Sequence, residues 1–289
     1  MITDTVSTLA PDVPSLPIQL IALDLDGTIV GQSNEIRDPI KQAIQAVQKQ
    51  GVQVMIATGR MFCSALRFYQ EIDCNLPIAC YQGALIKDPT TEIIHRHWSV
   101  PAPLVADLLD YLEDPQWIDQ ISIHFYIDDQ LYVREINDAT EDYCQRSQIQ
   151  PLAVGDLRFL SHREPTKVLV LSHIPEISSQ LLQGLQARYT PEQLYLTRSM
   201  STFLEATHPQ VNKREAVRYV AEELLGIEAD QVMAIGDNFN DLEMLQYAGI
   251  GVAMADAPPG VKQVADFVVP GVEADGVLTA IDKFILNNH

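Results

Sequence analysis

Two aspartates stand two residues apart in Asp24-Leu25-Asp26-Gly27-Thr28, directly after an apolar run that begins at Ile18. Such a run is typical of a strand buried on both faces of a parallel sheet, and ligands bind at the carboxyl ends of such strands. Two neighbouring carboxylates repel each other unless a cation or a proton lies between them. Mg²⁺ prefers carboxylate and phosphate oxygens as ligands. The segment therefore indicates a magnesium site that also receives a phosphate group, and a solvated turn is the alternative.

A second acidic motif, Gly236-Asp237-Asn238-Phe239-Asn240-Asp241, follows another apolar run that begins at Gln231. If the two strands are neighbours, Asp237 completes the protein ligands of the metal. Asp241 would then orient the water that coordinates the metal, without binding the metal itself. Taken alone, the motif also fits a turn that leads into a helix, with Asn240 or Asp241 as the N-cap residue.

Two further segments have the chemistry to bind a phosphoryl group. Thr58-Gly59-Arg60 follows the apolar run at residues 52–57, where a hydroxyl, backbone N–H groups and the missing Cβ of Gly59 form a phosphate cradle. Lys213 opens a predicted helix, where a lysine is unfavourable to the helix dipole unless a phosphate or the Asp24 carboxylate lies beside it. The alternatives are an ordinary turn for the first segment and a solvated side chain for the lysine.

The hydrophobic pattern predicts an α/β fold with a parallel sheet, because apolar runs alternate with helical periods. The predicted strands are residues 18–24, 52–57, 231–236, 250–254 and 267–269, and the predicted helices are residues 39–50, 61–71, 213–225, 242–247 and 277–286. Residues 1–17 contain three prolines and little periodicity, which predicts a flexible N-terminal tail.

Residues 88–206 show a different pattern, which predicts a separate α+β domain inserted into the core. Its clearest element is a hairpin over residues 121–134 around the turn Asp128-Asp129, and both aspartates are expected to be solvated. Further strands are predicted at residues 168–172 and 202–205, and helices at 103–112, 139–147 and 177–189. The core then consists of residues 18–87 and 207–289.

The composition argues against some classes of partner. A formal net charge of −20 and a pI near 4.5 disfavour nucleic acid and anionic membranes, and the acidity is simply explained by solubility. The four cysteines form no CxxC pair, which predicts reduced thiols. With no signal peptide and no long apolar run, a cytoplasmic location is expected. The oligomeric state is not indicated.

In this order, these motifs resemble those of the haloacid dehalogenase-like (HAD) phosphatases, specifically the Cof-type branch, which carries a large cap inserted between its second and third motifs. The resemblance covers residues 18–289 and includes residues 251–257 and 275–277. It implies a Rossmann-like HAD core with an inserted α+β cap domain. The chain departs from the usual pattern at Gln82, where the family commonly has Asn, in the residues that flank Lys213, and at Ala255-Asp256 in place of Gly-Asn.

The resemblance implies a role for each acidic residue. Asp24 would be the nucleophile, Asp26 the general acid and base, and Lys213 a catalytic cation. Asp24, the backbone carbonyl of Asp26 and Asp237 would ligate Mg²⁺, with Asp241 in support. Because a general acid has to carry a proton, the pKa of Asp26 is expected to be raised by neighbouring carboxylates or by burial.

The remaining motif residues would bind the phosphoryl group. Thr58, Gly59 and Lys213 would contact it directly. Asn240 would contact it or fix Lys213. Arg60 would support these residues without contacting the phosphoryl group. The expected function is a Mg²⁺-dependent phosphatase for small phosphorylated metabolites such as sugar phosphates, with a phosphoryl-aspartate intermediate on Asp24. The alternatives are a phosphotransferase or mutase with the same aspartyl chemistry, and a phosphate-binding or signalling domain without turnover.

Overall fold

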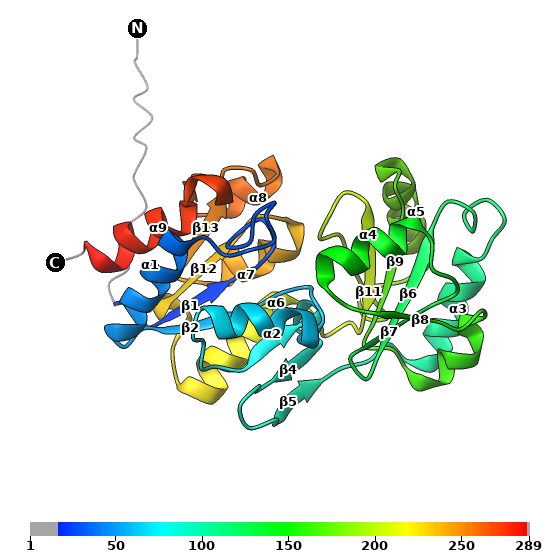
Figure 1. The fold of residues 1–289 in the computed structure, drawn as a ribbon, viewed down its shortest axis with the longest axis horizontal. Coiled ribbons are helices and arrows are strands. Elements are labelled where there is room, and N and C mark those ends of the chain that lie inside the picture. The colour runs from blue at the N-terminus through cyan, green and yellow to red at the C-terminus, as the bar shows by residue number, and fades with distance from the viewer. Residues whose placement is uncertain (1–16, 288–289) are drawn as a thin grey trace, which may run out of the picture.

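The computed structural model describes residues 17–287, so the predicted N-terminal tail lies outside the described residues except for Pro17. The described chain forms two bodies side by side (Figure 1). One contains a parallel sheet that is built from both ends of the chain, and the other contains an antiparallel sheet from its middle. The predicted α/β core with an inserted α+β domain is therefore confirmed.

The core sheet has five strands in the order β14-β13-β12-β1-β2, all parallel. The strands are β1 (Leu20–Leu23), β2 (Gln53–Ile56), β12 (Val232–Gly236), β13 (Ile250–Met254) and β14 (Phe267–Val269). Every residue of β1 and β12 is buried, as the uninterrupted apolar runs predict. Since Leu23 pairs with both Ile235 and Ile56, the segments that follow these three strands meet at one edge of the sheet.

Helices cover both faces of this sheet. They are α1 (Asp38–Lys49), α2 (Phe62–Glu71), α6 (Lys213–Arg218), α7 (Leu242–Tyr247), α8 (Pro259–Val264) and α9 (Gly276–Ile281). On α1 the buried residues Ile40, Ala43, Ile44 and Val47 follow the predicted helical period. Two predicted helices are α-helical only in their first part, because α6 continues as a π-helix over Tyr219–Leu225 and α9 over Asp282–Leu286.

A small antiparallel sheet, β3 (Ile78–Cys80), β4 (Leu85–Lys87) and β5 (Ile94–His97), extends from the core. The sequence pattern gave no sign of it, because strands of three or four residues are too short to show a period. The β4–β5 hairpin spans the predicted domain boundary between residues 87 and 88. The turn between β3 and β4 holds Tyr81 and Gln82 at positive φ.

The inserted domain has a six-stranded sheet in the order β10-β11-β9-β6-β7-β8. Its strands are β6 (Ser122–Ile127), β7 (Gln130–Val133), β8 (Pro151–Ala153), β9 (Lys167–Leu171), β10 (Tyr195–Thr197) and β11 (Phe203–Thr207). The predicted hairpin is β6–β7. The helices α3 (Ala102–Leu112), α4 (Asp138–Ser147) and α5 (Pro175–Arg188) complete the domain.

The two faces of this sheet belong to different apolar clusters. Phe125 on β6 packs in a cluster with Leu108 of α3 and Leu181 of α5. Its neighbour Tyr126 points to the other face and joins the cluster that continues into the core. The inserted domain is thus packed against the core through one face of its sheet. Among residues 17–287, no helix combines the length and apolar character that crossing a membrane requires.

Candidate active site

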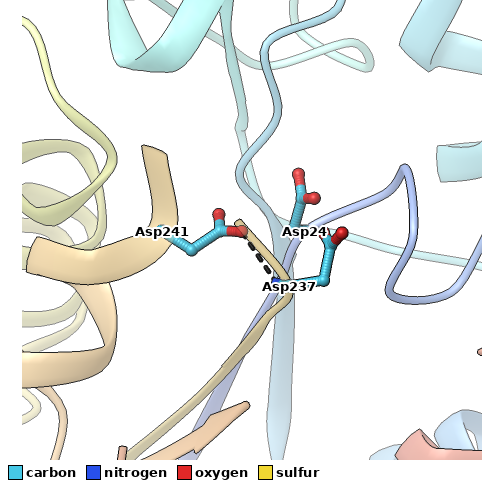
Figure 2. A group of neighbouring side chains, drawn as sticks. All are labelled: Asp24, Asp237 and Asp241. Carbon is cyan, nitrogen blue, oxygen red and sulfur yellow. Dashed lines mark hydrogen bonds between the residues drawn. The ribbon is translucent and has the colours of Figure 1, made fainter. Parts of the chain in front are cut away.

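Three carboxylates gather at the carboxyl edge of the core sheet. Asp24 follows β1 and Asp237 follows the neighbouring strand β12, and one oxygen of each lies within 4.8 Å of the other and of an oxygen of Asp241. Figure 2 shows Asp24 and Asp237 side by side, with Asp241 reaching toward the backbone of Asp237. The predicted convergence of the two acidic motifs therefore occurs, and Asp241 is part of the cluster itself.

Lys213 joins this cluster from the first turn of α6. Its Nζ donates to Asp24 Oδ1 and to Asp241 Oδ1, each at 2.5 Å, and the residue is only 1% exposed. Asn212 caps the helix by accepting a hydrogen bond from the backbone N–H of Glu215 at 2.8 Å. The lysine is therefore held at the helix N-terminus by carboxylates. The sequence suggested either a phosphate or the Asp24 carboxylate as the reason for its position, and the second of these is present.

Two glycines make room for the acidic side chains, Gly27 for Asp237 and Gly236 for Asp241. Gly27 has a φ of +85°, and a Cβ there would lie 2.3 Å from Asp237 Oδ2. A Cβ on Gly236 would lie 2.5 Å from the Cβ of Asp241. Asp241 Oδ2 also accepts hydrogen bonds from the backbone N–H groups of Asp237 and Asn238 at 3.0 Å each. These contacts fix the loop after β12 and leave Asp241 engaged on both oxygens.

The cluster carries more negative than positive charge. Burial raises the pKa of Asp24 to about 7, although Lys213 acts in the opposite direction. Burial and the charges of Asp24 and Asp241 raise the pKa of Asp237 to about 9. Burial alone would lower the pKa of Lys213, but the two carboxylates beside it raise that pKa above its ordinary value. Three carboxylates thus face one ammonium group, and a divalent cation with a preference for oxygen ligands fits this donor set.

The Asp26 side chain lies outside the acidic cluster. Arg60 donates to it from Nε and Nη2 at 2.7 Å each, and Arg146 of α4 donates from Nη2 at 3.0 Å. Burial by itself would raise the pKa of Asp26, but the hydrogen bonds and charges of these two arginines lower it below its ordinary value. The expectation of a raised pKa is therefore wrong for this arrangement, because two guanidinium groups stabilise the ionised carboxylate.

The predicted phosphate-binding residues lie next to the acids. Thr58 is 1% exposed, and its Oγ1 accepts a hydrogen bond from the backbone N–H of Arg60 at 3.1 Å. A Cβ on Gly59 would lie 2.4 Å from Gln82 Nε2, so a side chain at this position would have to displace the end of the Gln82 side chain. Asn240 donates from Nδ2 to Gln82 Oε1 at 3.1 Å, and its buried Oδ1 has no hydrogen-bond partner among the described residues. Asn240 therefore does not fix Lys213 here.

The inserted domain contributes residues that the sequence did not indicate. Arg146, Lys167 and Glu205 line the same cavity as Asp24 and Asp26. Their positions depend on how the two domains pack, so no local pattern in the sequence could have identified them.

Lys167 and Glu205 form a buried ion pair that contacts the core. Lys167 Nζ donates to Glu205 Oε2 at 2.9 Å and to the carbonyl oxygen of Gly59 at 2.8 Å. Gln82 Nε2 donates to both carboxylate oxygens of Glu205, at 3.2 and 3.3 Å. The Gln82 side chain therefore connects the inserted domain with Asn240 of the second acidic motif.

The comparison with known proteins decides the family. A family model described as haloacid dehalogenase-like hydrolase matches residues 21–281. The chain belongs to this family. YxeH of Bacillus subtilis is 31% identical over 278 residues, which cover 93% of this chain and 98% of YxeH. The 5-amino-6-(5-phospho-D-ribitylamino)uracil phosphatase YitU of the same organism is 29% identical over 275 residues, which cover 92% of this chain and 97% of YitU.

The solved structures agree with the fold. The crystal structure of TM0651 from Thermotoga maritima has a TM-score of 0.76 and 27% identity, and the match covers 92% of this chain and 97% of TM0651. The predicted membership of the HAD superfamily is confirmed. The predicted enzyme class is confirmed as well: this HAD hydrolase is a phosphatase, which acts on phosphate esters.

The raised pKa values of Asp24 and Asp237 predict how pH and Mg²⁺ together affect the stability of this HAD phosphatase. Without divalent cations, both groups retain protons in the folded state that the unfolded chain releases above about pH 4. Their contribution to the free energy of unfolding should therefore fall as the pH rises from about 4 to about 9. Mg²⁺ should raise Tm more at the upper end of this window than at the lower end.

Thermal unfolding with a chelator and with Mg²⁺, at both ends of this pH window, measures the effect. The difference between the two Tm values at each pH removes the contribution of groups that are remote from the cluster. A Mg²⁺ effect that does not grow with pH would contradict the electrostatic description of the cluster.

Proposed function

We propose that this HAD phosphatase is Mg²⁺-dependent and hydrolyses small phosphorylated metabolites, such as sugar phosphates, through a phosphoryl-aspartate on Asp24. The main support is the position of Lys213, which bonds both Asp24 and Asp241 inside a cluster with surplus negative charge. A buried carboxylate beside a buried ammonium group suits nucleophilic attack on an anionic phosphate ester.

Asp24 and Asp237 would hold the Mg²⁺, together with the backbone carbonyl of Asp26 that the family resemblance suggests. Bound there, Mg²⁺ would supply the positive charge that lets a phosphate dianion approach a carboxylate. The Asp241 oxygens are already engaged by Lys213 and by two backbone N–H groups. We therefore assign Asp241 the task of fixing Lys213 and the loop after β12.

The reaction would take place in two displacements at phosphorus. In the first, an Asp24 oxygen forms a bond to phosphorus as the bond to the leaving alcohol breaks. In the second, water attacks phosphorus, releases inorganic phosphate and restores the Asp24 carboxylate. Thr58, Gly59 and Lys213 would hold the phosphoryl oxygens during both steps. Thr58 and Lys213 are each only 1% exposed, which restricts access of solvent to the reacting group.

Asp26 would transfer protons in both steps, and its surroundings place a condition on the first. As an ionised carboxylate it is ready to accept a proton from the attacking water. To donate a proton to the leaving alcohol, it has to lose at least part of its contact with Arg60 and Arg146. Because Arg146 belongs to α4 of the inserted domain, the protonation of Asp26 would depend on the position of that domain over the substrate.

The cavity supports a small substrate with both polar and apolar parts. Beyond the acids it is lined by the charged Arg146, Lys167 and Glu205 and by the apolar Phe203 and Leu169. The relative YitU carries the name of a small phosphorylated compound, 5-amino-6-(5-phospho-D-ribitylamino)uracil, as its substrate.

Replacement of the nucleophile tests the proposal most simply. Asp24→Asn should lower kcat by at least about 10³-fold, because an amide oxygen is a poor nucleophile. The measurement is release of inorganic phosphate from an aryl phosphate with Mg²⁺, and thermal unfolding verifies that the variant is folded. Asp38→Asn, on the exposed start of α1, is the control and should retain full activity. Substantial turnover by Asp24→Asn would contradict the phosphoryl-aspartate.

The acid role of Asp26 predicts a dependence on the leaving group. Asp26→Ala should lower kcat for alkyl phosphates by about 10²–10⁴-fold, because an alkoxide leaves poorly without a proton. Aryl phosphates, whose leaving groups need less protonation, should lose less in the first step. The measurement is kcat for a series of esters with different leaving-group pKa values. An equal loss across the series would exclude Asp26 as the general acid.

A further inference from the structure

The turn of the β6–β7 hairpin contacts the core at the start of α2. Asp128 and Asp129 form this turn, both with positive φ, as in the two-residue turns of tight hairpins. Asp129 Oδ1 accepts a hydrogen bond from the backbone N–H of Phe62 at 3.0 Å, and Oδ2 accepts one from Cys63 at 2.9 Å. Tyr81 donates its hydroxyl to Asp129 Oδ1 at 2.6 Å. The expectation that Asp129 is simply solvated is therefore wrong.

This carboxylate replaces a cap that α2 lacks in its own sequence. The N-cap residue of α2 is Met61, which makes no side-chain capping bond. The first N–H groups of a helix need an acceptor from elsewhere, and a carboxylate there also favours the helix dipole. Asp129 supplies both from a segment that is 67 residues away in the chain. The inserted domain thus completes a helix of the core.

The segment held in this way is the phosphate-binding loop, which we define as residues 58–63 and which runs from the end of β2 into the first turn of α2. Lys167 holds the other end of the loop, since its Nζ donates to the carbonyl oxygen of Gly59 at 2.8 Å. Lys167 on β9 is the register partner of Tyr126 on β6, so Lys167 and Asp129 come from one corner of the six-stranded sheet. Asp129 is not among the residues that line the cavity, so any effect it has on a ligand has to act through the loop.

We propose that Asp129 is a positioning residue: the inserted domain uses it, together with Lys167, to hold the phosphate-binding loop in the conformation that receives the phosphoryl group. This inference rests on the proposed function in one respect, namely that Thr58 and Gly59 bind the phosphate. The inserted domain then has two tasks, because it covers the cavity and also shapes the loop beneath the substrate.

The two neighbouring aspartates of the turn offer a matched pair of variants. Asp129→Asn and Asp128→Asn remove the same charge from the same turn. Asp128 is exposed and pairs with Arg163 of the inserted domain, whereas Asp129 bonds to the loop. Asn has nearly the same volume as Asp and is an equally common N-cap residue, so both variants should fold, which thermal unfolding verifies. After the Asp129 change, only one carbonyl oxygen is left to accept from three donors.

Loss of a negative charge and loss of a positioning contact predict opposite changes in the affinity for phosphate. Removing a negative charge near an anion site should tighten phosphate binding slightly, and this is expected for Asp128→Asn. Loss of the loop contact should instead weaken binding of inorganic phosphate by about tenfold in Asp129→Asn, because small displacements of a binding group are costly. KM for an aryl phosphate should rise in parallel, while kcat should change less.

The dissociation constant of inorganic phosphate is measured by calorimetry with Mg²⁺ present, which does not require turnover. If Asp129→Asn binds phosphate as tightly as the wild type, or if both variants weaken it equally, the positioning role is wrong. If the wild type binds phosphate but releases none from any ester, the proposed function fails while the comparison of the two variants still decides the role of Asp129.

Discussion

The structure of the site depends on one electrostatic constraint, a buried lysine that faces three carboxylates. Lys213 contacts Asp24 and Asp241 directly, and Asp237 completes the group. Charges in a buried site interact strongly, so the surplus of negative charge has to be met by protons or by a cation. The arrangement requires β1 and β12 to be neighbours, and it requires glycine at residues 27 and 236, where a side chain would collide with the acids. The parallel sheet is what allows distant segments to meet at this edge.

The inserted domain is part of the site as well as a cover for it. Arg146 reaches Asp26, Lys167 reaches the carbonyl of Gly59, and Asp129 caps α2. Under the proposed function, each contact would bear on a different requirement of phosphoryl transfer: the protonation state of Asp26, the conformation of residues 58–63 and the position of α2. If these roles hold, a change in the position of the inserted domain would alter the proton transfer by Asp26 and the binding of phosphate together.

The sequence predicts the core of the site well because its signals are local. An apolar run that ends in acids identifies β1 and β12, and a lysine at a helix start is already anomalous for the helix dipole. The sequence could not predict the pairing of Asp26 with Arg146, since the two residues are 120 positions apart and meet only when the domains pack. Asp129 resembled a solvated turn residue because the amides it caps belong to another domain. The short strands β3–β5 were missed because they are too brief to show a period.

The central claim is that the acidic cluster around Lys213 holds one divalent cation in place of protons. A calorimetric titration of Mg²⁺ into the metal-free protein near pH 7, in two buffers with different ionisation enthalpies, measures both the stoichiometry and the protons released. The raised pKa values of Asp24 and Asp237 predict a single saturable site per chain, a release of protons on binding, and loss of the site in Asp237→Asn. Binding that releases no protons, or that is unchanged in Asp237→Asn, would contradict the account.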